Sequence, residues 1–233
     1  MTNYTVNEFI EQTKQSDHSE EKFGLERGRI LIANLENDKV WAKTGSMIAY
    51  HGDIKFEREG ITEHGISKLL KSKLTGEEME LMKAQGTGQA YFAEDGKKIS
   101  IIDLKGESIT VNSNDLLAFE DGLDWDVHSM KSIAGAVSGG LFNVKVEGEG
   151  MVAITTHYDP LTFKVSKDKP IYTDPDTTVA WSENLNPSIN TDVSFKTFIG
   201  RESGESIQMK FEGDGFVVVQ PYEEIYYNSV GNQ

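Results

Sequence analysis

Residues 81–92 read Leu-Met-Lys-Ala-Gln-Gly-Thr-Gly-Gln-Ala-Tyr-Phe, a glycine pair with a short lead-in before it and a strand-like segment after it. Similar pairs recur at spacings of 62 (148 − 86) and 65 (213 − 148) residues. The three pairs are Gly86 and Gly88, Gly148 and Gly150, and Gly213 and Gly215. A lysine stands three residues before each pair, and a strand-like apolar segment follows each one. A phosphate-binding loop would lead into a helix instead, so the glycines indicate fold positions that need a positive φ or a β-bulge.

A second pattern repeats at offsets of 69 (118 − 49) and 62 (180 − 118) residues. It is a small residue followed by an aromatic one, at the end of a strand that follows a polar turn. The three copies are Ala49-Tyr50, Ala118-Phe119 and Ala180-Trp181. Recurrence at equivalent places favours core or inter-unit packing over a ligand pocket for Tyr50, Phe119 and Trp181.

Together the patterns predict an all-β chain, a single globular domain over residues 1–233 built from three copies of one unit. We expect these units to lie around a pseudo-threefold axis, at roughly 20–85, 86–147 and 148–212. A closing strand, 213–220, is expected to pair with the N-terminal copy and remove the exposed sheet edge.

Two segments depart from the β pattern. Thr5-Val-Asn-Glu8 reads as a capping box and predicts a short helix over 5–15. Residues 66–73 form a second helix candidate inside an insert.

Composition narrows the classes of function. The formal charge is −15, from 38 acidic and 23 basic residues, which disfavours nucleic acid and anionic membranes as partners. No cysteine is present, so disulfides, thiolate nucleophiles and thiolate metal sites are excluded. Residues 1–15 lack the pattern of a secretory signal, and no apolar stretch reaches membrane-spanning length. We therefore expect a cytoplasmic protein.

Several motifs resemble a known family. They are the Gly-x-Gly pairs, the turn Gly45-Ser-Met-Ile-Ala-Tyr50, Gly139-Gly-Leu-Phe142 and the ending Gly215-Phe-Val-Val-Val-Gln220. The chain resembles bacterial proteins of a domain family of unknown function, related to the yeast protein named for altered inheritance of mitochondria. The resemblance implies three tandem units like subunits of the tryptophan RNA-binding attenuation protein, each a short double-stranded β-helix (jelly-roll-like) unit. It implies no activity, cofactor or catalytic residue.

Metal binding has weak candidates among the five histidines. The sequence contains no His-x-His pair of the cupin type. His157 and Asp159 are close in sequence, and His51 could approach them from another unit. Scattered surface histidines explain the pattern better, so we predict neither a metal site nor a cofactor.

Catalysis by other groups has little support. No serine lies in a Gly-x-Ser-x-Gly elbow. Adjacent carboxylates such as Glu120 and Asp121 point to opposite faces of a strand. The pair Asp124 and Asp126 flanks Trp125, which reads as a tryptophan anchored in the core.

Three functions remain open. The first is a non-catalytic binding or scaffold protein, with a protein partner or self-association through inserts 62–76 and 128–142, as a monomer or small homo-oligomer. The second is a jelly-roll enzyme with a metal or small-molecule pocket. The third is an RNA-binding protein, by analogy of fold alone and against the charge.

Overall fold

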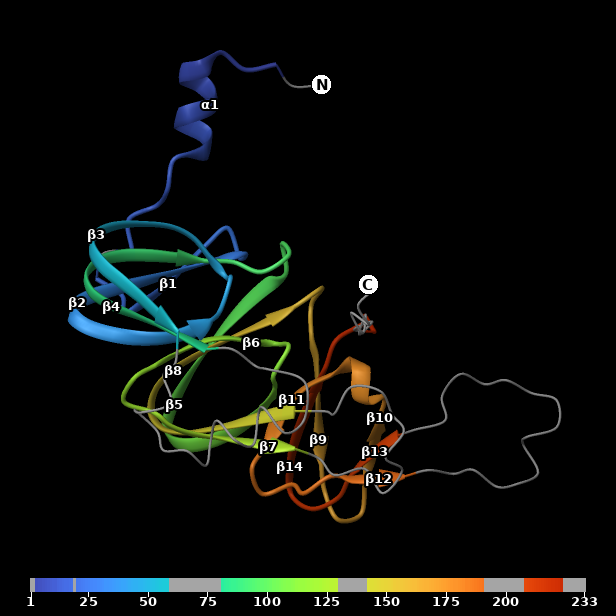
Figure 1. Cartoon of the computed structure of the whole chain (residues 1–233). Helices are drawn as coiled ribbons and strands as arrows, with labels where there is room; N and C mark the ends of the chain where they lie inside the picture. Colours follow the sequence, from blue (N-terminus) through green and yellow to red (C-terminus); the bar gives the residue numbers. More distant parts are fainter. Residues whose placement is uncertain (1–2, 19, 59–80, 130–141, 191–207, 224–233) are drawn as a thin grey trace, which may run out of the picture.

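The computed structural model describes residues 3–18, 20–58, 81–129, 142–190 and 208–223 (Figure 1). The elements are α1 (Val6–Thr13), β1 (Phe23–Glu26), β2 (Ile30–Lys43), β3 (Met47–Arg58), β4 (Leu81–Phe92), β5 (Lys98–Asn112), β6 (Leu116–Glu120), β7 (Asp124–Ser129), β8 (Phe142–Thr156), β9 (Leu161–Val165), β10 (Ile171–Thr173), the 3-10 turn η1 (Pro175–Thr177), β11 (Thr178–Ser182), β12 (Ser188–Asn190), β13 (Gln208–Phe211) and β14 (Gly215–Val219).

The predicted all-β class is confirmed. Eleven strands form one sheet, whose main path runs β3-β4-β2-β6-β8-β5-β11-β14-β9. β1 pairs with β2 and β7 pairs with β8 beside this path, and β10-β13-β12 form a second, smaller sheet. Each strand pairing in the described ranges is antiparallel.

The first two glycine pairs take the positive φ that the sequence predicts, but they lie inside long strands and not at the boundaries between units. Gly86 and Gly88 lie inside the continuous strand β4, and Gly148 and Gly150 lie inside β8. The predicted unit boundaries at 85/86 and 147/148 therefore fall within strands. All four glycines have φ between +123° and +151°. A Cβ atom on Gly86 would lie 1.9 Å from the carbonyl oxygen of Asp53 on β3, so close strand approach excludes a side chain there.

One β-bulge occurs three times in equivalent pairings. The register shifts between Met47 and Ala49 against β4, between Leu116 and Ala118 against β8, and between Thr178 and Ala180 against β14. One backbone hydrogen bond recurs beside it. Its donors and acceptors are Ala93 N–H to Ser46 O (2.9 Å), Thr155 N–H to Asp115 O (2.8 Å) and Gln220 N–H to Thr177 O (2.9 Å).

The predicted closing strand is wrong. Residues 215–219 form β14, which pairs with β11 on one side and with β9 on the other. Both partners are its neighbours in the C-terminal part of the chain, so this strand does not close the sheet against the N-terminal copy. Its antiparallel partners β9 and β11 bind the backbone N–H and C=O groups on both of its sides.

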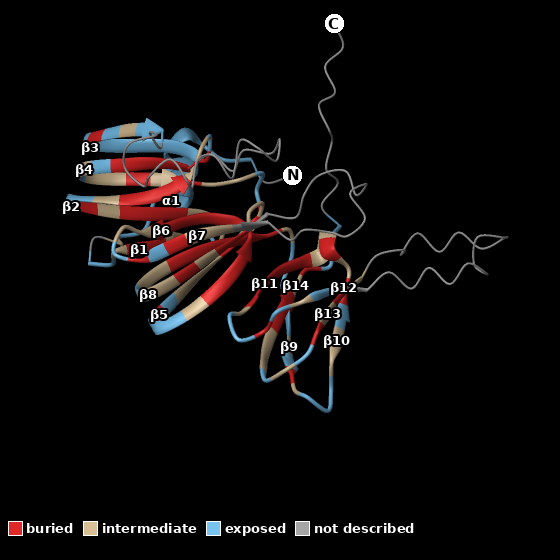
Figure 2. Cartoon of the chain, turned by 60° about the horizontal axis from the view of Figure 1, so that its bottom comes forward, coloured by how far each residue is buried: buried red, intermediate tan, exposed pale blue. Residues whose placement is uncertain are grey.

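Buried side chains form three hydrophobic clusters along the chain. The largest includes Trp41, Phe119 and Trp125, which lie buried with ring centroids 5.9 to 6.2 Å apart in tilted pairs. Trp125 of β7 is thus anchored in the core, as its position between two aspartates predicts. Figure 2 shows long buried stretches along β2, whereas β3 is mostly exposed.

The predicted N-terminal helix is confirmed as α1. Thr5 is its N-cap, and the reciprocal bonds between Thr5 and Glu8 complete the capping box. α1 has no buried residue and stands away from the sheets in Figure 1. The helix candidate 66–73 lies outside the described residues. Among the described helices, none is long and apolar enough to cross a membrane, and the cytoplasmic location stays a prediction.

Candidate functional site

Among the described strands, β3 carries large exposed apolar side chains at three of four consecutive positions. Along 47–50, Met47 is 36% exposed, Ile48 54% and Tyr50 50%. β3 pairs with β4 alone among the described strands, and it ends the main sheet. Apolar and aromatic residues make this segment a strand, and the bulge at its start turns neighbouring side chains outward. Among the described residues, no strand pairs with its outer backbone groups beside these apolar side chains.

His51 belongs to a polar ladder across this edge. Its Nε2 lies 2.9 Å from Gln89 Oε1 on β4, and Gln89 Nε2 donates to Asn34 Oδ1 on β2 (2.7 Å). The three residues face one another in the strand register. The ladder gives His51 a structural role in holding three strands in register.

The other two predicted ligands take different partners. The ring of His157 stacks on Tyr222 with centroids 3.7 Å apart, and Asp159 forms an exposed ion pair with Lys98. Within the described ranges, no three His, Cys, Asp or Glu residues gather where they could hold a metal ion. The structure therefore does not bring His51, His157 and Asp159 together as a ligand set.

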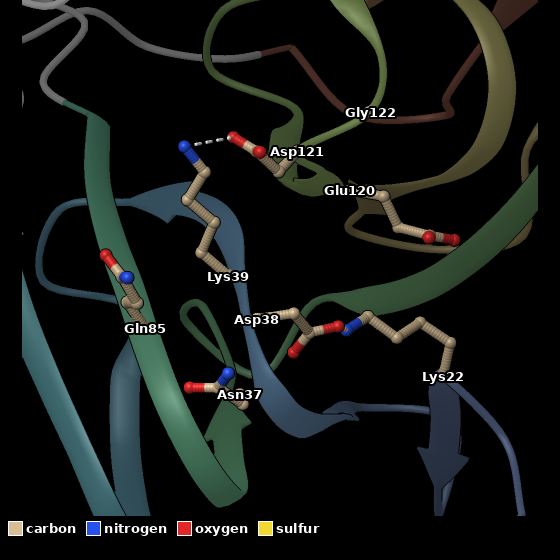
Figure 3. A pocket seen from close by; sticks show the side chains of 8 residues that line it. All are labelled: Lys22, Asn37, Asp38, Lys39, Gln85, Glu120, Asp121 and Gly122. Atoms are coloured by element: carbon tan, nitrogen blue, oxygen red, sulfur yellow. Dashed lines mark hydrogen bonds and ion pairs between the residues drawn. The ribbon is translucent and has the colours of Figure 1, made fainter.

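A polar pocket of about 350 Å³ opens between β2 and the turn after β6 (Figure 3). Its cations meet carboxylates: Lys22 pairs with Asp38, and Lys39 Nζ lies 3.1 Å from Asp121 Oδ1. Glu120 accepts a backbone N–H at 2.9 Å. Two lysines face three carboxylates in this lining, a net charge of −1, so the pocket does not favour an anion. It is lined by Lys22, Asn37, Asp38, Lys39, Gln85, Glu120, Asp121 and Gly122.

A buried polar cluster joins the turns after β4 and β5 to the end of β14. Lys97 and Asp115 are 4% and 1% exposed, with Lys97 Nζ 3.6 Å from Asp115 Oδ1. Thr155 Oγ1 donates to Glu94 (3.1 Å), and Gln220 Nε2 lies 3.5 Å from Asp115 Oδ1. These contacts join segments that are far apart in the sequence, in a buried environment with little water. We therefore assign the cluster a structural role.

The recurring lysines are paired with carboxylates. Lys145 lies between Glu147 (2.5 Å) and Glu183, and Ser108 also donates to Glu183. Hydrogen bonds from Lys145 and then Ser108 lower the pKa of Glu183, and bonds to Glu147 and Glu183 raise the pKa of Lys145. Lys210 has its pKa raised by its bond to Glu212 in the same way. We assign these lysines to local strand pairing.

The aromatic positions of the repeat differ in exposure. Phe119 and Trp181 are buried, whereas Tyr50 is half exposed. The sequence pattern grouped Tyr50 with its buried counterparts, so it did not single out 47–50 as a surface. The apolar run itself was the available signal. The sequence holds no signal for the pairing of Lys97 with Asp115, because only folding brings the turn after β4 and the turn after β5 together.

The predicted insert surfaces fall largely outside the described residues. This holds for all of 62–76 and for 130–141 of the second insert. Within the described sheets, the edge of β3 is the apolar surface that we consider as a candidate site.

Comparison with known proteins bears on the family and the fold. The family model described as "Mitochondrial biogenesis AIM24" matches residues 24–222. No curated protein matches the chain. The fold is similar to the X-ray structure of protein SPYM3_0169 from Streptococcus pyogenes, with a TM-score of 0.68 and 20% identity over 86% of this chain and 92% of that one. Since the family model matches nearly the whole sheet-forming part, this chain belongs to the AIM24 family.

Proposed function

We propose that the chain is a non-catalytic binding protein whose β3 edge accepts an extended polypeptide segment. The observation that carries the proposal is the exposed row Met47, Ile48 and Tyr50 on a strand with one partner among the described strands. An added strand would bond to the outer N–H and C=O groups, and its side chains would cover the apolar row.

The composition of the edge supports this choice. Proteins usually protect an edge strand with charged side chains, proline or a covering loop. Residues 47–52 read Met-Ile-Ala-Tyr-His-Gly and contain no Lys, Arg, Asp, Glu or Pro. Charged residues, beginning with Asp53 and Lys55, occupy the second half of β3. The unprotected half is the half with exposed apolar side chains.

We also propose that the scaffold is three related units with boundaries at the turns between long strands. The units would then be β1–β4, β5–β8 and β9–β14. The threefold recurrence of the bulge and of the backbone bond to Ser46, Asp115 and Thr177 supports this division. Tyr50 and Phe119 are then equivalent positions. Tyr50 is exposed on β3, which ends the sheet, and Phe119 is buried on β6, which lies between β2 and β8.

Two other functions predicted from the sequence have less support. A metal-dependent enzyme would need a ligand cluster, and the described part of the chain offers none. RNA binding is opposed by the net charge of −15. Metal analysis of the purified protein and a binding assay with single-stranded RNA at low salt test them directly.

Selection from a display library of linear peptides of about ten residues tests the proposal, because this length matches a long strand. We expect extended, apolar peptides that bind the wild-type chain and lose at least tenfold in affinity with Tyr50→Lys. Tyr158→Lys is the matched control, since Tyr158 is 59% exposed on the turn after β8. Failure to select any peptide, or equal loss with both variants, would contradict the proposal.

A further inference from the structure

Two junctions join the three proposed units, and they use the same register. In the first, β2 pairs with β6, and Trp41 lies opposite Phe119. In the second, β5 pairs with β11, and Thr110 lies opposite Trp181. The flanking pairs also correspond. They are Val40 with Glu120 and Ala42 with Ala118 in the first, and Ile109 with Ser182 and Val111 with Ala180 in the second.

The same offsets define a third junction between β10 and β3. Adding 62 (171 − 109) to the numbers of the β5 residues 109–111 gives Ile171–Thr173 of β10. Subtracting 69 (118 − 49) from the numbers of the β6 residues 118–120 gives Ala49–His51 of β3. Tyr172 would then lie opposite Tyr50, with Thr173 opposite Ala49. The residue types match: alanine at 49, 118 and 180, and an aromatic residue immediately after each.

Both halves of this third junction are exposed. β10 pairs only with β13, and β3 only with β4, among the described strands. Tyr172 is 49% exposed and Tyr50 50% exposed, whereas Phe119 and Trp181 of the formed junctions are buried. β3 and β10 lie at opposite ends of the molecule in both views (Figures 1 and 2). Each of these two ends of the molecule thus presents one strand of the third junction.

The third junction also lacks a polar clasp that the other two share. Lys39 pairs with Asp121 beside the first junction, and Ser108 donates to Glu183 beside the second. The equivalent positions beside the third are Pro170 and Gly52, which have no polar side chain. The equivalent positions therefore offer no polar side-chain contact of the kind found beside each of the other two junctions.

We propose that the β3 edge binds β10 of a second copy of this chain, antiparallel, with Tyr50 opposite Tyr172. This rests on the proposed function, for which it names the partner. A second copy can supply its β10 without rearrangement, whereas the chain's own β10 would have to cross the molecule. Because β3 and β10 are different surfaces, the contact is head-to-tail, and such contacts close into a ring when the rotation between copies allows it. Each copy carries a charge of −15, so association strengthens as salt screens the repulsion.

Disulfide trapping tests the pairing cleanly because the chain contains no cysteine. Directly opposed residues in an antiparallel pair are close enough for a disulfide. Mixing Tyr50→Cys with Tyr172→Cys under mild oxidation should give a covalent species at twice the 25.9 kDa of one chain. Mixing Tyr50→Cys with Tyr158→Cys is the control and should give several-fold less.

The double variant Tyr50→Cys/Tyr172→Cys separates the alternatives. A reduction-sensitive monomer, with no cross-linked dimer, means closure within one chain and overturns the proposal. Absence of any specific link also overturns it, and light scattering of the wild type at two salt concentrations checks that result. If selected peptides still bind at β3 in either case, the proposed function survives without the self-pairing.

Discussion

Lys39 Nζ of β2 lies 3.1 Å from Asp121 Oδ1, and the indole N–H of Trp41 donates to the same oxygen at 2.9 Å. One carboxylate on the turn after β6 therefore holds two neighbouring side chains of β2. Removing it with Asp121→Ala takes this acceptor away from the indole N–H of a buried tryptophan. We expect a loss of about 1 kcal/mol in the free energy of unfolding, measured by urea denaturation. Asp103→Ala, which removes an exposed ion pair with Lys105, should change stability by less than about 0.5 kcal/mol.

Gly86 tests the close approach of β3 and β4. Its φ of +144° and the 1.9 Å separation between a built Cβ and Asp53 O both oppose a side chain. Gly86→Ala should destabilise the fold by more than about 2 kcal/mol, because the paired backbones must separate. Gly122→Ala is the control, since a Cβ there meets nothing within 4 Å. Equal urea midpoints for the two variants would contradict the explanation.

The strands and the fold class could be predicted because they depend on local composition. Alternating apolar residues and glycine pairs marked β4 and β8, although their extent through Gly86 and Gly148 was missed. The pairing of β14 could not be predicted, since any apolar strand could have accepted it and only three-dimensional placement selects β9 and β11. The same limit applies to Lys97 and Asp115, which meet only in the folded chain.

Phe119 and Tyr50 occupy the same place in two units but have different surroundings. Phe119→Ala removes a buried ring and should cost about 3–5 kcal/mol of unfolding free energy. Tyr50→Ala removes a half-exposed ring whose aromatic contact is Phe56, with centroids 5.1 Å apart, and should cost below about 1 kcal/mol. The measurement is urea unfolding at low protein concentration, where dimers dissociate. A comparable loss for Tyr50→Ala would show that its ring is buried in solution.

The pKa of Glu183 predicts an acid-dependent second junction. Bonds from Lys145 and Ser108 lower this pKa below its ordinary value of 4.5. A lowered carboxyl pKa adds stability that is complete above 4.5 and disappears as pH falls through the lowered value. The pKa of Lys145 is raised above its ordinary value of 10.5, so the lysine stays protonated at neutral and acidic pH. Glu183→Gln should therefore flatten the fall in urea midpoint between neutral and acidic pH, whereas Glu149→Gln, at an exposed site on β8, should not.

α1 should be a locally stabilised helix that contacts the sheet region through the hydrogen bond from Arg27 to the carbonyl oxygen of Gln12 (2.9 Å). Eight residues are too few for a stable helix in water, and α1 has no buried residue, so its capping box carries much of its stability. Thr5→Ala should reduce the helical population, seen as smaller Cα chemical shifts across 6–13, and leave the urea midpoint of the sheets unchanged. Asn7→Ala, inside the helix, should keep or raise the helical population because alanine has the higher propensity. A lower urea midpoint in Thr5→Ala would mean that α1 packs on the sheets in solution.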